Sequence, residues 1–145
     1  MESKEQGYTL IELVVAIALI SLVGSLMMMG SKWTEEKMLH LKADEVAAAI
    51  EYAKQAASTT GESYALVFRK NRVCVQHNRE ILFTIALEEH QEIPDSITGE
   101  YMWFDGKSVS SLSTTIVIEN KAIRKRGNIA VRVATSKIRV YYENI

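Results

Sequence analysis

Apolar residues form one unbroken run near the start of the chain. Residues 13–31 contain no charged side chain and are rich in Leu, Ile, Val and Met. At about 1.5 Å per residue, a helix over this run is about 28 Å long, which is close to the thickness of the hydrocarbon core of a bilayer. The run therefore predicts a helix that can cross a membrane.

After this run, the apolar residues recur at steps of three and four, which is the spacing of one helical face. They are Leu39, Ala43, Val46, Ile50, Ala53 and Ala57. The spacing predicts that the helix continues as an amphipathic segment whose stripe packs on a sheet. Nothing between residues 8 and 58 demands a break, although Gly24-Ser25 could bend the helix. Gly61 is predicted to cap the helix in a left-handed conformation.

The remainder of the chain has short runs of alternating apolar and polar residues, which predict β-strands. The predicted strands are 64–69, 73–76, 80–85, 114–119, 129–134 and 137–142. Residues 134–137 are predicted to join the last two strands as a hairpin. Its predicted core-facing residues are Ile129, Val131, Val133, Ile138, Val140 and Tyr142, and its outward residues are Arg132, Lys137 and Arg139. Residues 88–100 predict a loop, and Asp105-Gly106 a turn.

Together these elements predict an α+β fold. A long N-terminal helix, transmembrane in its first half and amphipathic in its second, packs on a small antiparallel β-sheet domain. A helix of about 51 residues is about 76 Å long, which exceeds what so small a domain can cover. Its first half is therefore expected to lie in lipid or against other helices.

Glu12 stands at the edge of the apolar run, after Leu10 and Ile11. An acid inside a membrane segment costs about 2.5 kcal/mol or more near the centre and less near an interface, so a partner is expected. Cleavage of the chain after Gly7 would create an ammonium group on Tyr8, four residues before Glu12 or on a neighbouring molecule. In a poor solvent the attraction between these charges is strong.

Two simpler interpretations compete for this segment. A secretory signal would need a basic start and a small-residue cleavage site beyond its core, but the start holds Glu2 and Glu5, and Met side chains interrupt the small residues from 24 to 30. A plain single-pass anchor is the other alternative. Lys4 precedes the run while Lys32 and Lys37 follow it, so the distribution of positive charge does not orient the segment.

The segment Gly7-Tyr8-Thr9-Leu10-Ile11-Glu12-Leu13 resembles the leader motif of prepilins of the type IV pilin-like superfamily, Gly-Phe-Thr-Leu-Ile-Glu followed by an apolar stretch. Tyr8 replaces the usual Phe, and the leader is acidic where such leaders are commonly basic. The resemblance implies that a prepilin peptidase cuts between Gly7 and Tyr8 and methylates the new amine of Tyr8. Glu12 would then neutralise the N-terminus of an adjacent subunit during assembly.

The resemblance also gives the domain boundaries. They are a leader peptide at 1–7, a transmembrane and assembly helix at 8–31, its amphipathic continuation at 32–60, and a β-rich pilin domain at 61–145. It implies a single-pass protein of the cell membrane that passes into an extracytoplasmic filament at the cell surface. The implied partners are other pilin or pseudopilin subunits, the prepilin peptidase, the assembly platform and its ATPase, and the membrane.

Two kinds of minor pseudopilin are similar to the rest of the chain. The helix, its alanine-rich stretch and the following strands look like GspH of type II secretion. Residues 128–142 look more like the end of ComGD, a minor pseudopilin of the competence machinery in Gram-positive bacteria, which we favour. This resemblance implies a filament subunit needed for DNA uptake in transformation.

The chemistry-bearing residues indicate neither an enzyme nor a metal protein. The one cysteine, Cys74, cannot form an intrachain disulfide and is expected to be a buried small side chain. His40, His77 and His90 lack metal-ligand spacing and are expected at the surface. No nucleotide-binding, redox or metalloprotease motif and no credible nucleophile is present, so we predict no catalytic residue, metal or cofactor.

Charge is unevenly distributed although the net charge is only -1. Residues 80–105 hold seven acids and no Lys or Arg, whereas residues 121–145 hold seven bases and one acid. One basic cluster could contact DNA phosphates or another subunit: Lys121, Arg124, Lys125 and Arg126. The alternative is a solvated loop, or a surface that complements the acidic region within the fold or between subunits.

Overall fold

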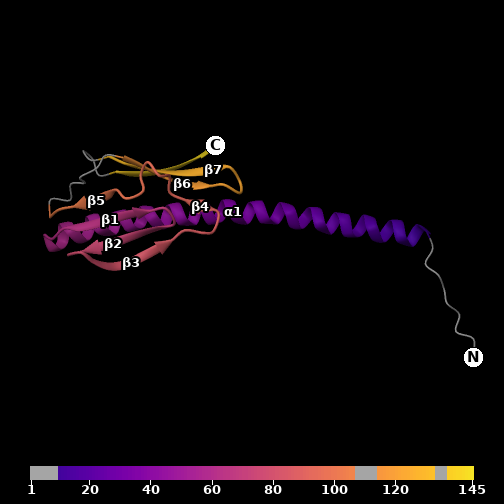
Figure 1. Ribbon diagram of the computed structural model, residues 1–145, viewed down its shortest axis with the longest axis horizontal. Helices are drawn as coiled ribbons and strands as arrows, with labels where there is room; N and C mark the ends of the chain where they lie inside the picture. The colour runs from indigo at the N-terminus through magenta and orange to yellow at the C-terminus, as the bar shows by residue number, and fades with distance from the viewer. Residues whose placement is uncertain (1–9, 107–113, 133–136) are drawn as a thin grey trace, which may run out of the picture. The chain divides into compact units, whose positions relative to one another are not determined.

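The computed structural model describes residues 10–106, 114–132 and 137–145. The chain divides into two compact units, residues 1–34 and residues 35–145. One helix, α1 (Leu10–Thr60), belongs to both units (Figure 1). Gly24-Ser25 does not interrupt it, and the single long helix predicted from the sequence is confirmed.

In the second unit, α1 buries the stripe of apolar residues that the spacing predicted. All six residues of this stripe are fully buried: Leu39, Ala43, Val46, Ile50, Ala53 and Ala57. Leu41 and Tyr52, which lie off the stripe, are 57% and 47% exposed. Beyond the last residue of α1, Gly61 has a φ of 74° and its amide donates to the carbonyl of Ala57 at 2.9 Å. This is the predicted left-handed cap, which glycine adopts without steric cost.

The first sheet is antiparallel, with the strand order β3-β2-β1-β5. Its strands are β1 (Tyr64–Arg69), β2 (Arg72–His77), β3 (Glu80–Ala86) and β5 (Tyr101–Phe104). Two-residue connections join β1 to β2 and β2 to β3. In the second of these, Asn78 and Arg79 both have positive φ, which matches the right-handed twist of a tight hairpin.

The second sheet is also antiparallel, with the order β4-β6-β7-β8. Its strands are β4 (Gln91–Glu92), β6 (Thr114–Asn120), β7 (Lys125–Val131) and β8 (Ile138–Asn144). Ile116, Ile129 and Val140 stand side by side across its three long strands. Ile116 and Ile129 are fully buried, while Val140 is partly buried.

The helix and both sheets share one hydrophobic core. Phe68 from β1, Ile118 from β6 and Ile50 from α1 are among its fully buried members. Gly127 allows α1 to approach β7 closely. A Cβ at this position would stand 3.3 Å from the Cβ of Ala43 and from the ring of Tyr142. The predicted α+β architecture, a long helix on antiparallel sheets, is confirmed.

Several details of the sequence prediction need correction. The expected loop at 88–100 contains β4, and β5 was not predicted at all. Strand β7 begins at Lys125 rather than at residue 129, so part of the basic cluster lies in a strand and not in a loop. The predicted hairpin at 134–137 and Val133 fall largely outside the described residues. In the described part of this hairpin, Ile129 and Val131 are buried, as predicted. The three basic residues are exposed, also as predicted: Arg132, Lys137 and Arg139.

Two histidines also differ from their predicted surface positions. His40 is partly buried and stacks on the ring of Tyr142, with ring centroids 3.8 Å apart. His77 is partly buried, stacks on Tyr64 at 4.5 Å and pairs with the carboxylate of Glu62. Only His90 of the three is exposed. A flat imidazole ring packs well against a tyrosine ring, which explains why polar residues occur at these positions.

Candidate assembly site

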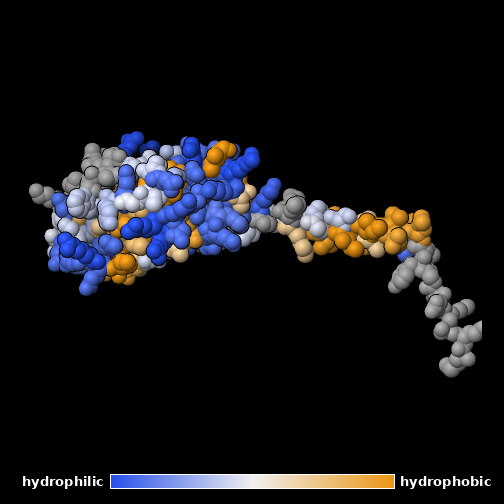
Figure 2. Space-filling view, viewed as in Figure 1, coloured by the Kyte–Doolittle hydropathy of each residue, from blue (hydrophilic) through white to orange (hydrophobic). Residues whose placement is uncertain are grey.

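The first unit presents apolar side chains without covering them. From Leu10 to Met27, every described residue of α1 is exposed, with large side chains such as Leu19 and Ile20 at 57% and 72%. In Figure 2 this part of the surface is mostly hydrophobic, whereas the second unit is mostly hydrophilic. By length and composition the helix can cross a membrane, with a mean hydropathy of 2.5 over its most apolar window. Such an apolar surface must be surrounded by lipid or by other helices.

The hydroxyl groups of Ser21 and Ser25 are satisfied by the backbone of the helix itself. Ser21 donates to the carbonyl of Ile17 at 2.8 Å, and Ser25 donates to the carbonyl of Leu22 at 2.7 Å. Polar groups placed in hydrocarbon need internal partners of this kind, because no water is available there. These serines therefore do not prevent the helix from lying in lipid.

Glu12 lies in the first turn of the described helix and is exposed. A carboxylate near a helix N-terminus interacts favourably with the positive end of the helix dipole. The predicted cleavage and methylation residues, Gly7 and Tyr8, lie outside the described residues. The arrangement of Glu12 and an amine on Tyr8 therefore stays a prediction.

In the second unit, polar contacts fasten the start of the packed helix to the second sheet. The ammonium of Lys125 at the start of β7 donates to the carboxylate of Glu36, and the amide of Asn120 at the end of β6 donates to Glu35 at 2.9 Å. Asn120 is fully buried, and its carbonyl oxygen accepts from the amide of Ala122 at 3.0 Å. No local pattern in the sequence predicts these two contacts, because the partners in each are separated by more than eighty residues.

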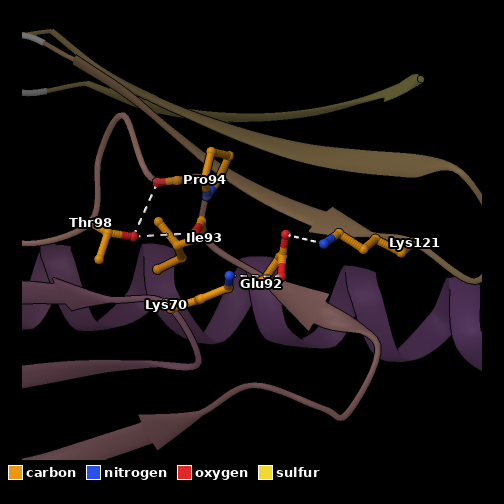
Figure 3. Close-up of polar contacts among 6 residues, drawn as sticks. All are labelled: Lys70, Glu92, Ile93, Pro94, Thr98 and Lys121. Carbon is orange, nitrogen blue, oxygen red and sulfur yellow. Dashed lines mark hydrogen bonds and ion pairs between the residues drawn. The ribbon is translucent and has the colours of Figure 1, made fainter.

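A second ionic contact connects the two sheets. The carboxylate of Glu92 in β4 lies between the ammonium of Lys70, which follows β1, at 3.8 Å, and that of Lys121, which follows β6, at 2.5 Å (Figure 3). The amide of Ile93 donates to the carbonyl of Lys70 at 2.8 Å. The hydroxyl of Thr98 lies within 3.2 Å of the carbonyls of Ile93 and Pro94. The acidic connection at 88–100 is thus an ordered link between the sheets.

In the structure, three of the four residues of the predicted basic cluster pair with different carboxylates. Lys121 pairs with Glu92, Lys125 with Glu36, and Arg126 donates to Glu143 at 2.9 Å. Arg124 is exposed in the turn before β7 and has a positive φ of 53°. The predicted complementarity between the basic and acidic regions therefore occurs within the fold at Lys121 and Glu92. Three of these cations have an intramolecular partner, which weakens the case for a DNA contact at this cluster.

These ion pairs should make the free energy of unfolding depend on pH. Lys125 holds the pKa of Glu36 below its ordinary value through a hydrogen bond, and Lys121 does the same for the pKa of Glu92. A carboxyl whose pKa is lower in the folded state binds fewer protons there, so it stabilises the fold above the ordinary pKa. That stabilisation is lost as pH falls through about 4 and below.

Accordingly, we expect the free energy of unfolding to decrease from pH 6 to pH 3, and to decrease less in the double variant Glu36→Gln/Glu92→Gln. Chemical unfolding of the full chain in neutral detergent, followed by circular dichroism at each pH, measures this dependence. Glu51→Gln is the control, since Glu51 pairs locally with Lys54 three residues along α1. An unchanged pH dependence in the double variant would show that these pairs do not govern acid stability.

Comparisons with known proteins agree with this geometry. Residues 3–28 match the family described as the prokaryotic N-terminal methylation motif. No curated protein matches the sequence. Two crystal structures of the type IV minor pilin FimU from Pseudomonas aeruginosa are similar, with TM-scores of 0.58 and 0.55 and identities of 14% and 13%. The similarity covers 75% and 71% of this chain and 92% of each FimU chain. The chain therefore combines a prokaryotic N-terminal methylation motif with the fold of a type IV minor pilin.

Proposed function

We propose that the chain is a minor pilin-like subunit of a membrane-anchored filament, processed by a prepilin peptidase between Gly7 and Tyr8 and methylated on Tyr8. The observation that carries the proposal is a helix whose first part exposes apolar side chains and lies within the match to the N-terminal methylation motif, in a chain whose second unit buries its own core. A subunit that polymerises needs such a surface, because neighbouring helices bury it in the filament. The role is structural, and the catalysis belongs to the peptidase.

Glu12 is the proposed assembly residue. After cleavage, its carboxylate would neutralise the amine of Tyr8 on an adjacent subunit and set the stagger between them. The proposed partners are other pilin subunits, the peptidase, the assembly platform with its ATPase, and the membrane. The exposed apolar helix supports a single-pass position in the cell membrane before the subunit enters an extracytoplasmic filament.

For the machine we propose the competence filament that takes up DNA, on the resemblance of residues 128–142 to the end of ComGD. A GspH-like role in a type II secretion pseudopilus is the alternative within the same fold. A gene for an outer-membrane secretin near this gene would favour secretion and count against competence. An assembly ATPase and a polytopic platform would accompany either machine.

The mass of the mature protein tests the proposal. Protein isolated from its native membrane is expected to lack residues 1–7 and to carry one additional methyl group. Intact-mass spectrometry with sequencing of the N-terminal peptide measures both changes. A Gly7→Leu variant should keep the full-length mass, because a bulky side chain blocks the peptidase cleft. A native protein that still begins with Met1 would contradict the proposal and indicate a tethered domain.

A further inference from the structure

A pocket of about 620 Å³ opens on the face of the β7–β8 pair that is directed away from the core. It is lined by Ala130, Arg132, Lys137, Arg139, Val140 and Tyr141. Ala130 stands opposite Arg139 in the ladder, and the amide of Arg132 donates to the carbonyl of Lys137 at 3.2 Å. This volume lies within the range of about 300–1,000 Å³ that is typical of ligand sites.

The pocket gathers positive charge without acids. No carboxylate is among its described lining residues, and the ion pairs of the described part of the chain involve none of Arg132, Lys137 and Arg139. The acids of this sheet face in the described part of the chain are Glu92, Glu119 and Glu143. Glu119 and Glu143 stand beside Arg126, four residues along β7 from Ala130 and therefore about 13 Å away, and Glu92 stands opposite Glu119 in β4. Three cations that share one concave surface create a local potential that attracts anions.

Tyr141 adds an aromatic surface to this pocket. The residue is 42% exposed and stands two residues after Arg139 on the same face of β8, as the pleat of a strand requires. Opposite it in β7 is Asn128, which is 4% exposed. A small Ala130 between larger neighbours leaves the room that makes the pocket hollow. Arginine forks bind phosphate oxygens, and an exposed aromatic ring stacks on a base.

We infer that this pocket binds single-stranded nucleic acid, with phosphates on Arg132, Lys137 and Arg139 and a base stacked on Tyr141. The inference rests on the proposed function, since DNA uptake provides the ligand, and it moves the DNA contact away from the cluster at 121–126. There three of the four cations are already paired with carboxylates. Tyr141 favours nucleic acid over a polyanion without bases.

Binding of fluorescent oligo(dT) to the full chain in neutral detergent, followed by anisotropy at several salt concentrations, tests the inference. Arg132→Ser/Arg139→Ser should weaken binding at least tenfold and reduce the slope of log K against log salt by about 1.4, or 0.7 per lost phosphate contact. The matched control is Arg69→Ser/Arg72→Ser, which removes the same charge at an exposed hairpin of the first sheet. The control should bind within about threefold of the unmodified chain.

Tyr141→Leu separates nucleic acid from other anions. It should weaken oligo(dT) binding about 5- to 150-fold, the loss of 1–3 kcal/mol of stacking, and leave binding of inorganic polyphosphate unchanged. The inference is overturned if Arg132→Ser/Arg139→Ser binds oligo(dT) as tightly as the control Arg69→Ser/Arg72→Ser. It is also overturned if Tyr141→Leu binds oligo(dT) like the unmodified chain. A third contrary result is competition by polyphosphate or phosphatidylglycerol vesicles that equals that of oligo(dT) at the same phosphate concentration. Thermal unfolding of each variant verifies its fold.

Failure of this inference can be distinguished from failure of the proposed function, because binding is measured without processing or assembly. Loss of DNA binding alongside a correctly processed native protein would remove the inference and leave the filament proposal intact. An unprocessed native N-terminus would contradict the filament proposal whatever the pocket binds.

Discussion

Replacing Glu12 by alanine is expected to leave cleavage after Gly7 intact and to abolish incorporation into filaments. On the proposed function, the carboxylate meets an ammonium group of another subunit inside the membrane. At a separation of about 4 Å and an effective dielectric constant of about 20, this attraction is about 4 kcal/mol. Its loss corresponds to nearly three orders of magnitude in an association constant. Alanine also makes the segment easier to insert, so failure to assemble could not be attributed to poor insertion.

The measurement compares processed protein in the membrane with protein in sheared filaments, using quantitative immunoblots. Glu12→Asp should retain part of the assembly because the charge remains. Glu45→Ala removes an exposed acid from the second unit and should assemble normally. Filaments of Glu12→Ala at the level of the unmodified chain would contradict the assigned role of Glu12, as would a failure of cleavage in that variant.

Leu39→Ala is expected to cost about 2–5 kcal/mol of the free energy of unfolding, whereas Leu41→Ala, the same change two residues away, should cost less than about 0.5 kcal/mol. Leu39 is fully buried in the core, and Leu41 is 57% exposed on the other side of α1. Removing buried methyl groups loses their transfer free energy and leaves a cavity, while an exposed leucine loses neither.

Guanidinium unfolding of the full chain in neutral detergent, followed by circular dichroism, measures both variants under the same conditions. Because the two variants change helix propensity equally, a difference between their free energies of unfolding reports the burial of the leucine. Equal losses for Leu39→Ala and Leu41→Ala would mean that the stripe does not anchor α1 to the sheets. Leu41→Ala should also be processed like the unmodified chain, with loss of residues 1–7 and gain of one methyl group.

The helix could be predicted from the sequence because its evidence is local. Steps of three and four place Leu39 and its equivalents on one face whatever they pack against, and Gly61 supplies a cap that few other residues tolerate. β5 was detectable in principle, since Tyr101–Phe104 are aromatic or apolar residues favoured in strands. β4 was not, because it has only two residues and exists through its pairing with β6.

The contacts around the candidate site were harder to predict for a physical reason. Glu36 and Lys125 are far apart in sequence, and only the fold brings their charges together. The basic cluster at 121–126 is dense in sequence, yet three of its four members have separate carboxylate partners on α1, β4 and β8. Arg132, Lys137 and Arg139 were correctly predicted to face outward. The pocket that they share depends on the register in which β7 pairs with β8, and the sequence does not give that register.

The burial of Cys74 provides a built-in reporter of local opening. Cys74 is 6% exposed within the first sheet, where the hydroxyl of Thr84 lies 3.6 Å from the sulfur. Because the sequence holds one cysteine, a thiol-specific alkylating reagent modifies this position alone. The rate of modification therefore follows the fraction of time for which strands β1, β2 and β3 separate. In a filament, slower modification than in the isolated subunit would reveal how far neighbouring subunits suppress that opening.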